Sequence, residues 1–292
     1  MFARIHVILL ILAGLIPAAG YTVPKVVSTI NPIHFLVVAV SNGVLEPVLP
    51  STGTSCVHDC AVKPSDVSKF DRADILFYID EELEPFVKKL SARSKKKFVR
   101  LSDAVPLLAS RSARDSGRGY DVKDFHIWLS PANAEKIIQT ICSTLSDEDP
   151  ENAHLYRQNT ENILKKLDVM TEKITEILAP VKDVPYVVIH DAYQYFDRYF
   201  GLNFVAALSS GHTVSTTARA LHAAKTAAKA HATKCIFIDN TVGKIGAALV
   251  PNDAAHHIYT VDPVGTSIAA SENGYFELMM SLAEQFRECL SK

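Results

Sequence analysis

Short apolar runs alternate with amphipathic segments along the first half of the chain. The runs are rich in β-branched and aromatic residues and predict strands, whereas the segments between them place apolar residues three and four apart, as helices do. The predicted strands are 25–29, 46–49, 75–79 and 98–101, and the predicted helices are 33–40, 65–73 and 85–90. This alternation favours a parallel sheet covered by helices, an α/β fold.

The middle of the chain predicts two helices. Ser130-Pro131 combines a helix-capping residue with a proline at the first helical position and predicts a helix to about residue 145. Residues 150–178 contain no glycine and no internal proline, and their apolar residues lie mostly three and four apart. We therefore expect one long amphipathic helix, which at 1.5 Å per residue spans roughly 40 Å. Its apolar stripe comprises Tyr156, Ile163, Leu167, Met170, Ile174 and Ile177.

The alternation resumes after Pro180 and predicts a second α/β unit. Its strands are 186–189, 204–207, 235–238 and 258–261, and its further segments are 193–199, 217–230, 244–249 and 275–290. The length also suits two domains. We expect an N-terminal lobe at 21–149, a linking helix at 150–179 and a C-terminal lobe at 180–292. The stretch 110–123, with its arginines and glycines, predicts a mobile loop.

The N-terminus has the layout of a secretory signal. Arg4 precedes an apolar run at 5–16 and small residues at 17–20, so we expect cleavage after Gly20 and an exported, soluble protein. The apolar run is shorter than the roughly 20 residues that cross a bilayer. The formal net charge is only −2, which gives no indication of a nucleic-acid partner.

Three histidines, His58, His126 and His190, lie in loop-like contexts far apart in the sequence. Any ligand that they share must be held between separate parts of the fold. His190 and Asp262 each follow a predicted strand, and open α/β sheets bind ligands beyond the carboxyl ends of strands. Imidazole and carboxylate are zinc ligands. Each residue also has an ordinary alternative: a surface or hydrogen-bonded histidine, or a turn-forming aspartate.

Other chemistry stays open or is disfavoured. Cys56 and Cys60 flank His58 and are compatible with a disulfide, two free thiols or a local zinc half-site. The chain contains no G-x-S-x-G, HExxH or phosphate-binding glycine motif. A zinc-dependent hydrolase remains as an enzymatic alternative, but we identify no general base for it.

Five segments resemble one known family. The chain is similar to the periplasmic zinc-binding component of high-affinity zinc ABC transporters, within the metal-specific class of solute-binding proteins. The segments are 27–34 (Val-Ser-Thr-Ile-Asn-Pro-Ile-His), 57–66 with His58 and Lys63-Pro64-Ser65-Asp66, 126–131 (His-Ile-Trp-Leu-Ser-Pro), 190–196 (His-Asp-Ala-Tyr-Gln-Tyr-Phe) and 261–265 (Val-Asp-Pro-Val-Gly).

The resemblance implies a monomeric periplasmic receptor, not an enzyme, that holds one Zn²⁺ between its lobes and delivers it to a membrane permease. His58, His126 and His190 match the three histidine ligands, and Asp262 or water completes the site. Asp59 and Asp191 are candidates for acidic residues that surround the metal ligands or lie on the surface of a lobe. Relatives of the zinc type also carry a disulfide at positions resembling Cys235 and Cys289, which implies the same bridge here.

Two alternatives remain within this architecture. Related receptors bind Mn²⁺, but His190 keeps this site rich in nitrogen, whereas manganese favours oxygen ligands. A metal-binding adhesin would keep the same fold. The family's usual histidine- and acid-rich loop is replaced here by residues 111–123, so the sequence predicts no metal-gathering role for that segment.

Overall fold

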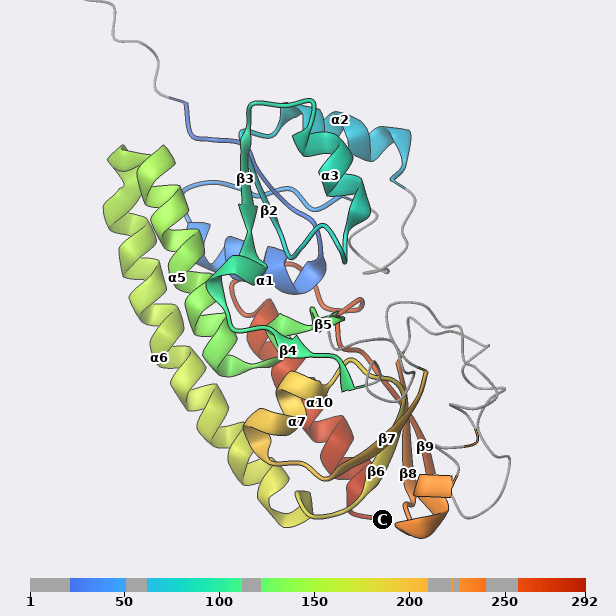
Figure 1. Cartoon of the computed structure of the whole chain (residues 1–292). Helices are drawn as coiled ribbons and strands as arrows, with labels where there is room; N and C mark the ends of the chain where they lie inside the picture. Colours follow the sequence, from blue (N-terminus) through green and yellow to red (C-terminus); the bar gives the residue numbers. More distant parts are fainter. Residues whose placement is uncertain (1–21, 51–61, 112–121, 210–221, 223–225, 240–256) are drawn as a thin grey trace, which may run out of the picture.

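The computed structural model describes residues 22–50, 62–111, 122–209, 222, 226–239 and 257–292, and it has two α/β lobes beside one long helix (Figure 1). The N-terminal lobe contains a three-stranded parallel sheet in the order β1-β2-β3. Its elements are β1 (Val26–Ser28), α1 (Asn31–Ser41), α2 (Pro64–Arg72), β2 (Ile75–Tyr78), α3 (Pro85–Ser91) and β3 (Lys97–Arg100).

Both faces of this sheet are covered, so its central strand is apolar throughout. Ile75 and Phe77 of β2 face the main core, and Leu76 and Tyr78 face a smaller cluster formed with α2 and α3. Side chains alternate across a strand, and parallel sheets bury both faces. The strand and helix predictions for this lobe are therefore confirmed, with one exception.

The exception is the predicted strand at 46–49, which was wrong. Val48 makes an isolated parallel bridge to Val27, with backbone hydrogen bonds from Val48 to Val26 (2.8 Å) and from Ser28 to Val48 (3.2 Å). Pro47 and Pro50 flank this residue and have no N–H groups to extend the ladder.

The C-terminal lobe contains a four-stranded parallel sheet in the order β7-β6-β8-β9. Its strands also divide between two faces: Val188 and Phe237 join the main core, whereas Val187 and Ile236 pack on the opposite face. Predicted segment 244–249 lies outside the described residues, as does most of 217–230, of which 226–230 is helical. The elements are β6 (Tyr186–His190), α7 (Gln194–Phe200), β7 (Phe204–Ser209), β8 (Cys235–Asp239), β9 (His257–Val261) and α10 (Gly274–Leu290).

A short antiparallel pair lies between the two sheets. β4 (Leu108–Ala109) pairs with β5 (Lys123–Asp124), and a single 3₁₀ turn, η3 (Ile127–Leu129), follows it. The predicted mobile loop at 110–123 therefore begins and ends at paired strands, and its residues 112–121 lie outside the described part of the chain. Each of these strands contains only two paired residues, which is too few for an alternating pattern to be recognised in the sequence.

Two long helices form one side of the molecule (Figure 1). α5 (Pro131–Glu148) begins at the predicted cap, where the Ser130 hydroxyl accepts a hydrogen bond from the Asn133 amide at 3.4 Å. α6 (Ala153–Leu178) is flanked by 3₁₀ turns η4 (Pro150–Asn152) and η5 (Ala179–Val181). The predicted long helix is confirmed. Because α6 packs against α1 and α5 of one lobe and α10 of the other, it braces both.

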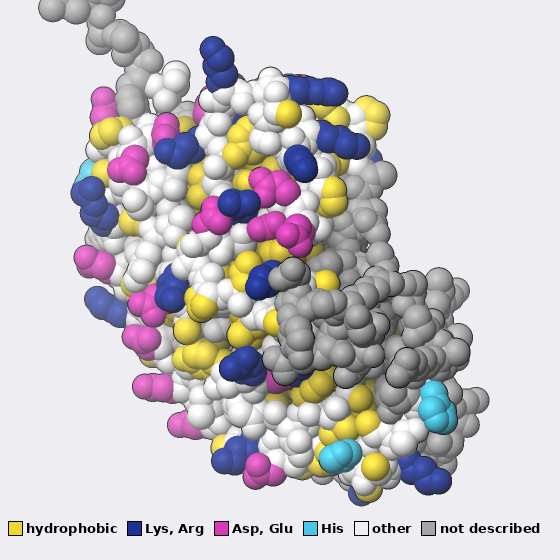
Figure 2. All heavy atoms as spheres, viewed as in Figure 1, with side chains coloured by type: hydrophobic (Ala, Val, Ile, Leu, Met, Phe, Trp, Pro, Cys, Tyr) yellow, Lys and Arg dark blue, Asp and Glu magenta, His cyan; other side chains and the backbone are white. Residues whose placement is uncertain are grey.

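On the face in Figure 2, basic and acidic side chains are interspersed, including along the edge formed by α5 and α6. This agrees with a net charge near zero. Within the described residues, no helix combines the length and apolar character needed to cross a bilayer.

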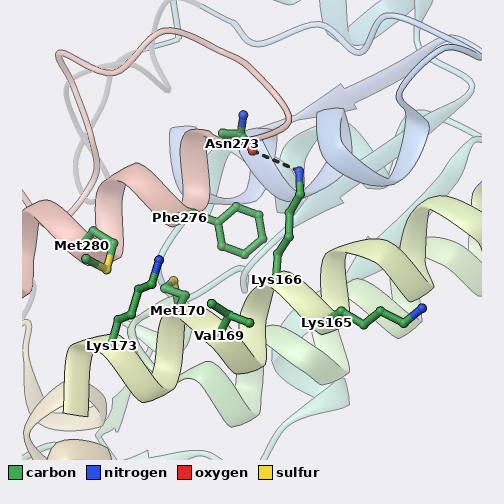
Figure 3. Close-up of a pocket in the computed structure, with 8 residues that line it drawn as sticks. All are labelled: Lys165, Lys166, Val169, Met170, Lys173, Asn273, Phe276 and Met280. Carbon is green, nitrogen blue, oxygen red and sulfur yellow. Dashed lines mark hydrogen bonds between the residues drawn. The ribbon is translucent and has the colours of Figure 1, made fainter. Parts of the chain in front are cut away.

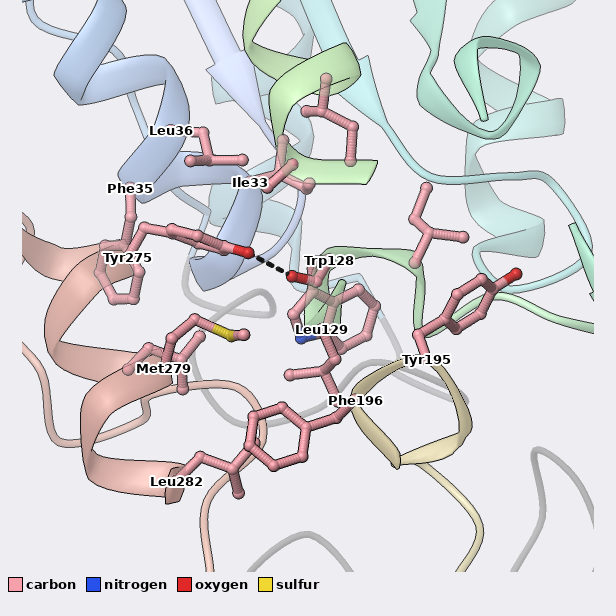
Figure 4. Packing of buried hydrophobic residues seen from close by; sticks show 14 of the residues in the cluster. Ile33, Phe35, Leu36, Trp128, Leu129, Tyr195, Phe196, Tyr275, Met279 and Leu282 are labelled. Carbon is pink, nitrogen blue, oxygen red and sulfur yellow. Dashed lines mark hydrogen bonds between the residues drawn. The ribbon is translucent and has the colours of Figure 1, made fainter. Parts of the chain in front are cut away.

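The main hydrophobic core runs without interruption through both lobes (Figure 4). Trp128 is fully buried at the junction, where its indole N–H donates to the Pro263 carbonyl at 2.8 Å. The Tyr275 hydroxyl donates to the Trp128 carbonyl at 2.7 Å, and the Asn31 amide donates to the Gly265 carbonyl at 3.0 Å. Each bond joins a residue before α6 to a residue after it. The two lobes therefore share one packed core and are not connected only by a flexible hinge.

A disulfide fastens the last helix to the C-terminal sheet. Cys235 opens β8, Cys289 lies near the end of α10, and their Cα atoms are 5.9 Å apart. The bridge closes a sequence separation of 54 residues. Cross-links over loops of this size stabilise by roughly 4 kcal/mol in the unfolded-state entropy description. Cys142 is a buried free thiol.

We predict that Gly274→Ala weakens the contact between the lobes. A Cβ atom at this first residue of α10 would lie 2.6 Å from Cδ1 of the Phe35 ring on α1. Overpacking a filled core costs about 1–3 kcal/mol, so the free energy of unfolding should fall by that amount in urea titrations. Phe35→Leu should relieve part of this loss in a double-mutant cycle. An unchanged free energy for Gly274→Ala would contradict the packing described.

Candidate metal centre

His126 is held by an aspartate two residues before it. Asp124, the last residue of β5, accepts a hydrogen bond from the His126 backbone N–H at 3.0 Å, and the same oxygen lies 2.8 Å from Nδ1 of the ring. An Nδ1–H donated to this carboxylate places the imidazole lone pair on Nε2. Only 4 % of His126 is exposed. Such carboxylate–histidine pairs commonly orient metal ligands.

His190 repeats this arrangement from the other lobe. It ends β6, and its Nδ1 lies 2.5 Å from Oδ2 of Asp239, which ends the neighbouring parallel strand β8. The His126 and His190 rings meet edge to face with their centroids 5.0 Å apart. Two predicted ligands that are 64 positions apart in the numbering are therefore neighbours, each oriented by a buried carboxylate.

Carboxylates make this position strongly favourable for a cation. Burial alone would lower the pKa of His190, but the hydrogen bond and charge of Asp239, together with the charges of Asp191 and Asp124, raise it above its usual value. The same negative potential that attracts a proton attracts a metal dication. A metal ion and a proton would compete for the imidazole.

Asp262 directly follows β9 and is half-buried. Its Oδ1 accepts hydrogen bonds from the amides of Val264 (3.1 Å) and Gly265 (2.9 Å). Its Oδ2 accepts from the amide and hydroxyl of Thr266, both at 2.6 Å. Asp262 therefore has the turn-forming role that its position before proline indicates. Its role as a metal ligand stays a prediction.

The third predicted histidine, His58, lies outside the described residues, as do Cys56, Asp59 and Cys60. Within the part of the chain that is described, no group of three or more histidine, cysteine, aspartate or glutamate side chains is arranged to hold a metal. A metal ion bound by His126 and His190 would therefore need at least one further donor. Two neighbouring imidazoles fit zinc, which takes nitrogen donors at a tetrahedral centre.

The sequence matches a known protein family over most of its length. The family ZnuA, described as "Zinc-uptake complex component A periplasmic", matches residues 26–289. This chain belongs to the ZnuA family. It is 27 % identical to the high-affinity zinc uptake system protein ZnuA of Haemophilus ducreyi, over 91 % of this chain and 93 % of that one. It is 29 % identical to ZnuA of Yersinia pestis, over 91 % of each.

Solved structures show the same fold as this ZnuA family member. The Zn(II)-bound structure of a mutant AdcAII of Streptococcus pneumoniae has a TM-score of 0.76 and 25 % identity, covering 90 % of this chain and 98 % of that one. A crystal structure of ZnuA has a TM-score of 0.77 at 18 % identity, covering 91 % and 99 %. The predicted two-lobed α/β architecture is confirmed.

The remaining described histidines have other surroundings. Burial lowers the pKa of His34 to about 4, so its ring is neutral, and its Nδ1 pairs with the Ser28 hydroxyl at 2.8 Å. His154, His222 and His231 are exposed. His257 begins β9 and is exposed.

An apolar groove elsewhere is not the metal site (Figure 3). It has a volume of about 410 Å³ and lies between α6 and α10, with Phe276, Met170 and Met280 in its wall and Lys166 and Lys173 at its rim. Its lining contains no histidine, cysteine or carboxylate. Cationic and apolar side chains of this kind offer no donor for zinc.

Sequence reasoning missed the two aspartates that orient the histidines. Asp239 follows an apolar strand run, so the strand-end argument that selected His190 and Asp262 also applies to it. Asp124 precedes His126 by two residues, but only the structure shows that its carboxylate bends back to the ring. Arg111 was assigned to a mobile loop, yet it is largely buried and pairs with Asp191 and Asp197.

We predict that Asp239→Asn flattens the pH dependence of stability in metal-free protein. Folding raises the pKa of His190, so the protonated ring adds to the free energy of unfolding. This contribution is fully present below the pKa of the unfolded state, near 6.5, and is lost as the pH rises through the higher pKa of the folded state. Urea titrations from pH 6 to 9 should show a smaller loss of stability in the variant than in wild type. The exposed His154→Gln should keep the wild-type profile. Identical profiles for wild type and Asp239→Asn would contradict the assignment.

Proposed function

We propose that this protein is an extracytoplasmic solute-binding protein that captures Zn²⁺ and delivers it to the permease of an ABC transporter. The observation that carries the proposal is the contact between the buried rings of His126 and His190, one from each lobe, each paired with a buried carboxylate. Membership of the ZnuA family supports it, as do relatives named high-affinity zinc uptake proteins. Members of this family are transport receptors, not enzymes.

The proposed ligand set is His58, His126 and His190, with Asp262 or water as the fourth donor. Three neutral imidazoles favour zinc over manganese, which prefers more oxygen ligands. Manganese is the alternative cargo within the same receptor class. The surrounding carboxylates hold the ring nitrogens in place and offset the charge of the bound ion.

The proposed organisation keeps the N-terminal lobe at 21–149, the linking helix at 150–179 and the C-terminal lobe at 180–292. We also propose that residues 1–20 are a signal peptide removed on export, and that the receptor acts as a monomer.

The continuous core and the hydrogen bonds of Trp128 and Tyr275 resist separation of the lobes. Zinc would therefore enter and leave through local movement and modest tilting rather than wide hinge closure.

We predict that His126→Ala and His190→Ala each weaken zinc binding severely. Changing the outer partners of a metal site typically costs about 10- to 100-fold in affinity, and removing a ligand should cost at least the upper end of that range. Calorimetry with a competing chelator measures the effect, and wild type should bind one zinc per chain. His154→Ala, on the exposed face of α6, is the matched control. Unchanged zinc affinity in both ligand variants would overturn the proposed function.

Asp262→Asn separates the two candidates for the fourth donor in the same assay. A loss as large as that of the histidine variants would identify the Asp262 carboxylate as the ligand. A loss of a few-fold would identify water as the ligand and leave Asp262 as the residue that caps the turn at Val264–Thr266.

A further inference from the structure

Arg111 joins the two lobes beside the predicted metal ligands. It lies just after β4, before α6 in the sequence, but its guanidinium contacts residues that follow α6. Nε lies 3.1 Å from both carboxylate oxygens of Asp191, and one terminal nitrogen lies 2.7 Å from Oδ2 of Asp197. The guanidinium carbon lies 3.4 Å from the centroid of the Phe204 ring. Two ion pairs and stacking on the Phe204 ring thus hold the Arg111 side chain in place.

The hairpin that carries Arg111 is attached to the same part of the C-terminal lobe by further contacts. The Tyr195 hydroxyl accepts a hydrogen bond from the Leu108 amide at 2.9 Å and donates one to the Asp124 carbonyl at 2.8 Å. The Gln194 amide donates to the Ala109 carbonyl at 3.3 Å. Both strands of the hairpin are therefore bonded to the start of α7.

These contacts connect the hairpin to the chain segments that carry the two histidines. Asp124, on β5, orients the His126 ring, and Asp191, which binds Arg111, directly follows His190 in the chain. Movement of the hairpin away from α7 would displace the partner of one ligand and release the neighbour of the other. The separation of the two imidazoles thus depends on the attachment of this hairpin.

We propose that Arg111 is a positioning residue that locks the β4–β5 hairpin onto the C-terminal lobe and thereby sets the geometry and lifetime of the bound metal. The inference rests on the proposed zinc-binding function and deepens it. Arg111 does not touch the metal in this account. It acts through Asp191, and through the hairpin that carries Asp124.

The chemistry of the site calls for arginine at this position. Asp191 and Asp197 are 7 % and 3 % exposed, and two buried carboxylates this close repel each other unless a cation lies between them. Guanidinium binds both in its plane and stacks on Phe204 with its face, which the compact ammonium of lysine cannot do. Lysine would therefore restore the charge but not the geometry.

The test compares Arg111→Met and Arg111→Lys with wild type. Zinc dissociation into excess chelator is followed by stopped flow, and the visible spectrum of the Co²⁺-loaded protein reports the coordination geometry. We expect zinc to dissociate about 10- to 100-fold faster from Arg111→Met, with a smaller change in the association rate and an altered cobalt spectrum. Arg111→Lys should recover part of the lifetime.

Arg100→Met is the matched control, because Arg100 also binds two carboxylates, Glu81 and Asp103, but on the exposed surface of the N-terminal lobe. Its dissociation rate and cobalt spectrum should equal those of wild type. Phe204→Leu keeps both ion pairs and removes the stacking, and it should give an intermediate lifetime. If Arg111→Met does not fold, the same measurements on Arg111→Lys and Phe204→Leu provide the test.

Three outcomes decide the matter. A faster dissociation rate with an altered cobalt spectrum supports the inference. Variants that melt at lower temperature but keep the wild-type dissociation rate and spectrum would overturn it, because Arg111 would then only stabilise the fold. Absence of tight zinc binding in wild type would instead overturn the proposed function, so the two failures are distinguishable.

Discussion

The contact between the lobes at Trp128 is the constraint on which the rest of the structure depends. The indole is fully buried, its N–H binds the Pro263 carbonyl, and its own carbonyl accepts a hydrogen bond from Tyr275. Trp128 is two residues after His126, and Pro263 directly follows Asp262. The junction that seals the two lobes is therefore adjacent in the chain to a predicted ligand on each side. A rigid junction would give the proposed metal site a fixed geometry before any ion arrives, which would lower the entropic cost of binding.

Buried carboxylates surround the two histidines of the proposed site and favour a cation there. Asp124 and Asp239 each hold the Nδ1 side of one imidazole, while Asp191 and Asp197 share the guanidinium of Arg111. The first pair holds the two imidazole rings, and the second pair fastens the hairpin that carries Asp124. Orientation and charge thus come from the same residues. Metal-site aspartates of this kind influence affinity through the ligands that they hold.

Much of this architecture could be predicted from local sequence. The stripe from Tyr156 to Ile174 predicts a helix because it repeats at helical spacing, and the strand-end positions of His190 and Asp262 indicate an edge where ligands bind. The strand-end argument also applies to Asp239, but its pairing with His190 and the roles of Asp124 and Arg111 could not be predicted in this way, because each depends on a partner brought close only by folding. Arg111 is 80 positions from Asp191. The prolines at 47 and 50 show the opposite case, in which local chemistry overrides an apolar run.

A zinc-loaded crystal structure with anomalous data across the zinc and manganese absorption edges tests the central claim most directly. The account predicts one zinc peak at the lobe junction, within about 2.0–2.1 Å of Nε2 of both His126 and His190. Nδ1 of each ring should remain paired with Asp124 or Asp239. A zinc ion bound away from these two histidines, or coordinated by only one of them, would contradict it.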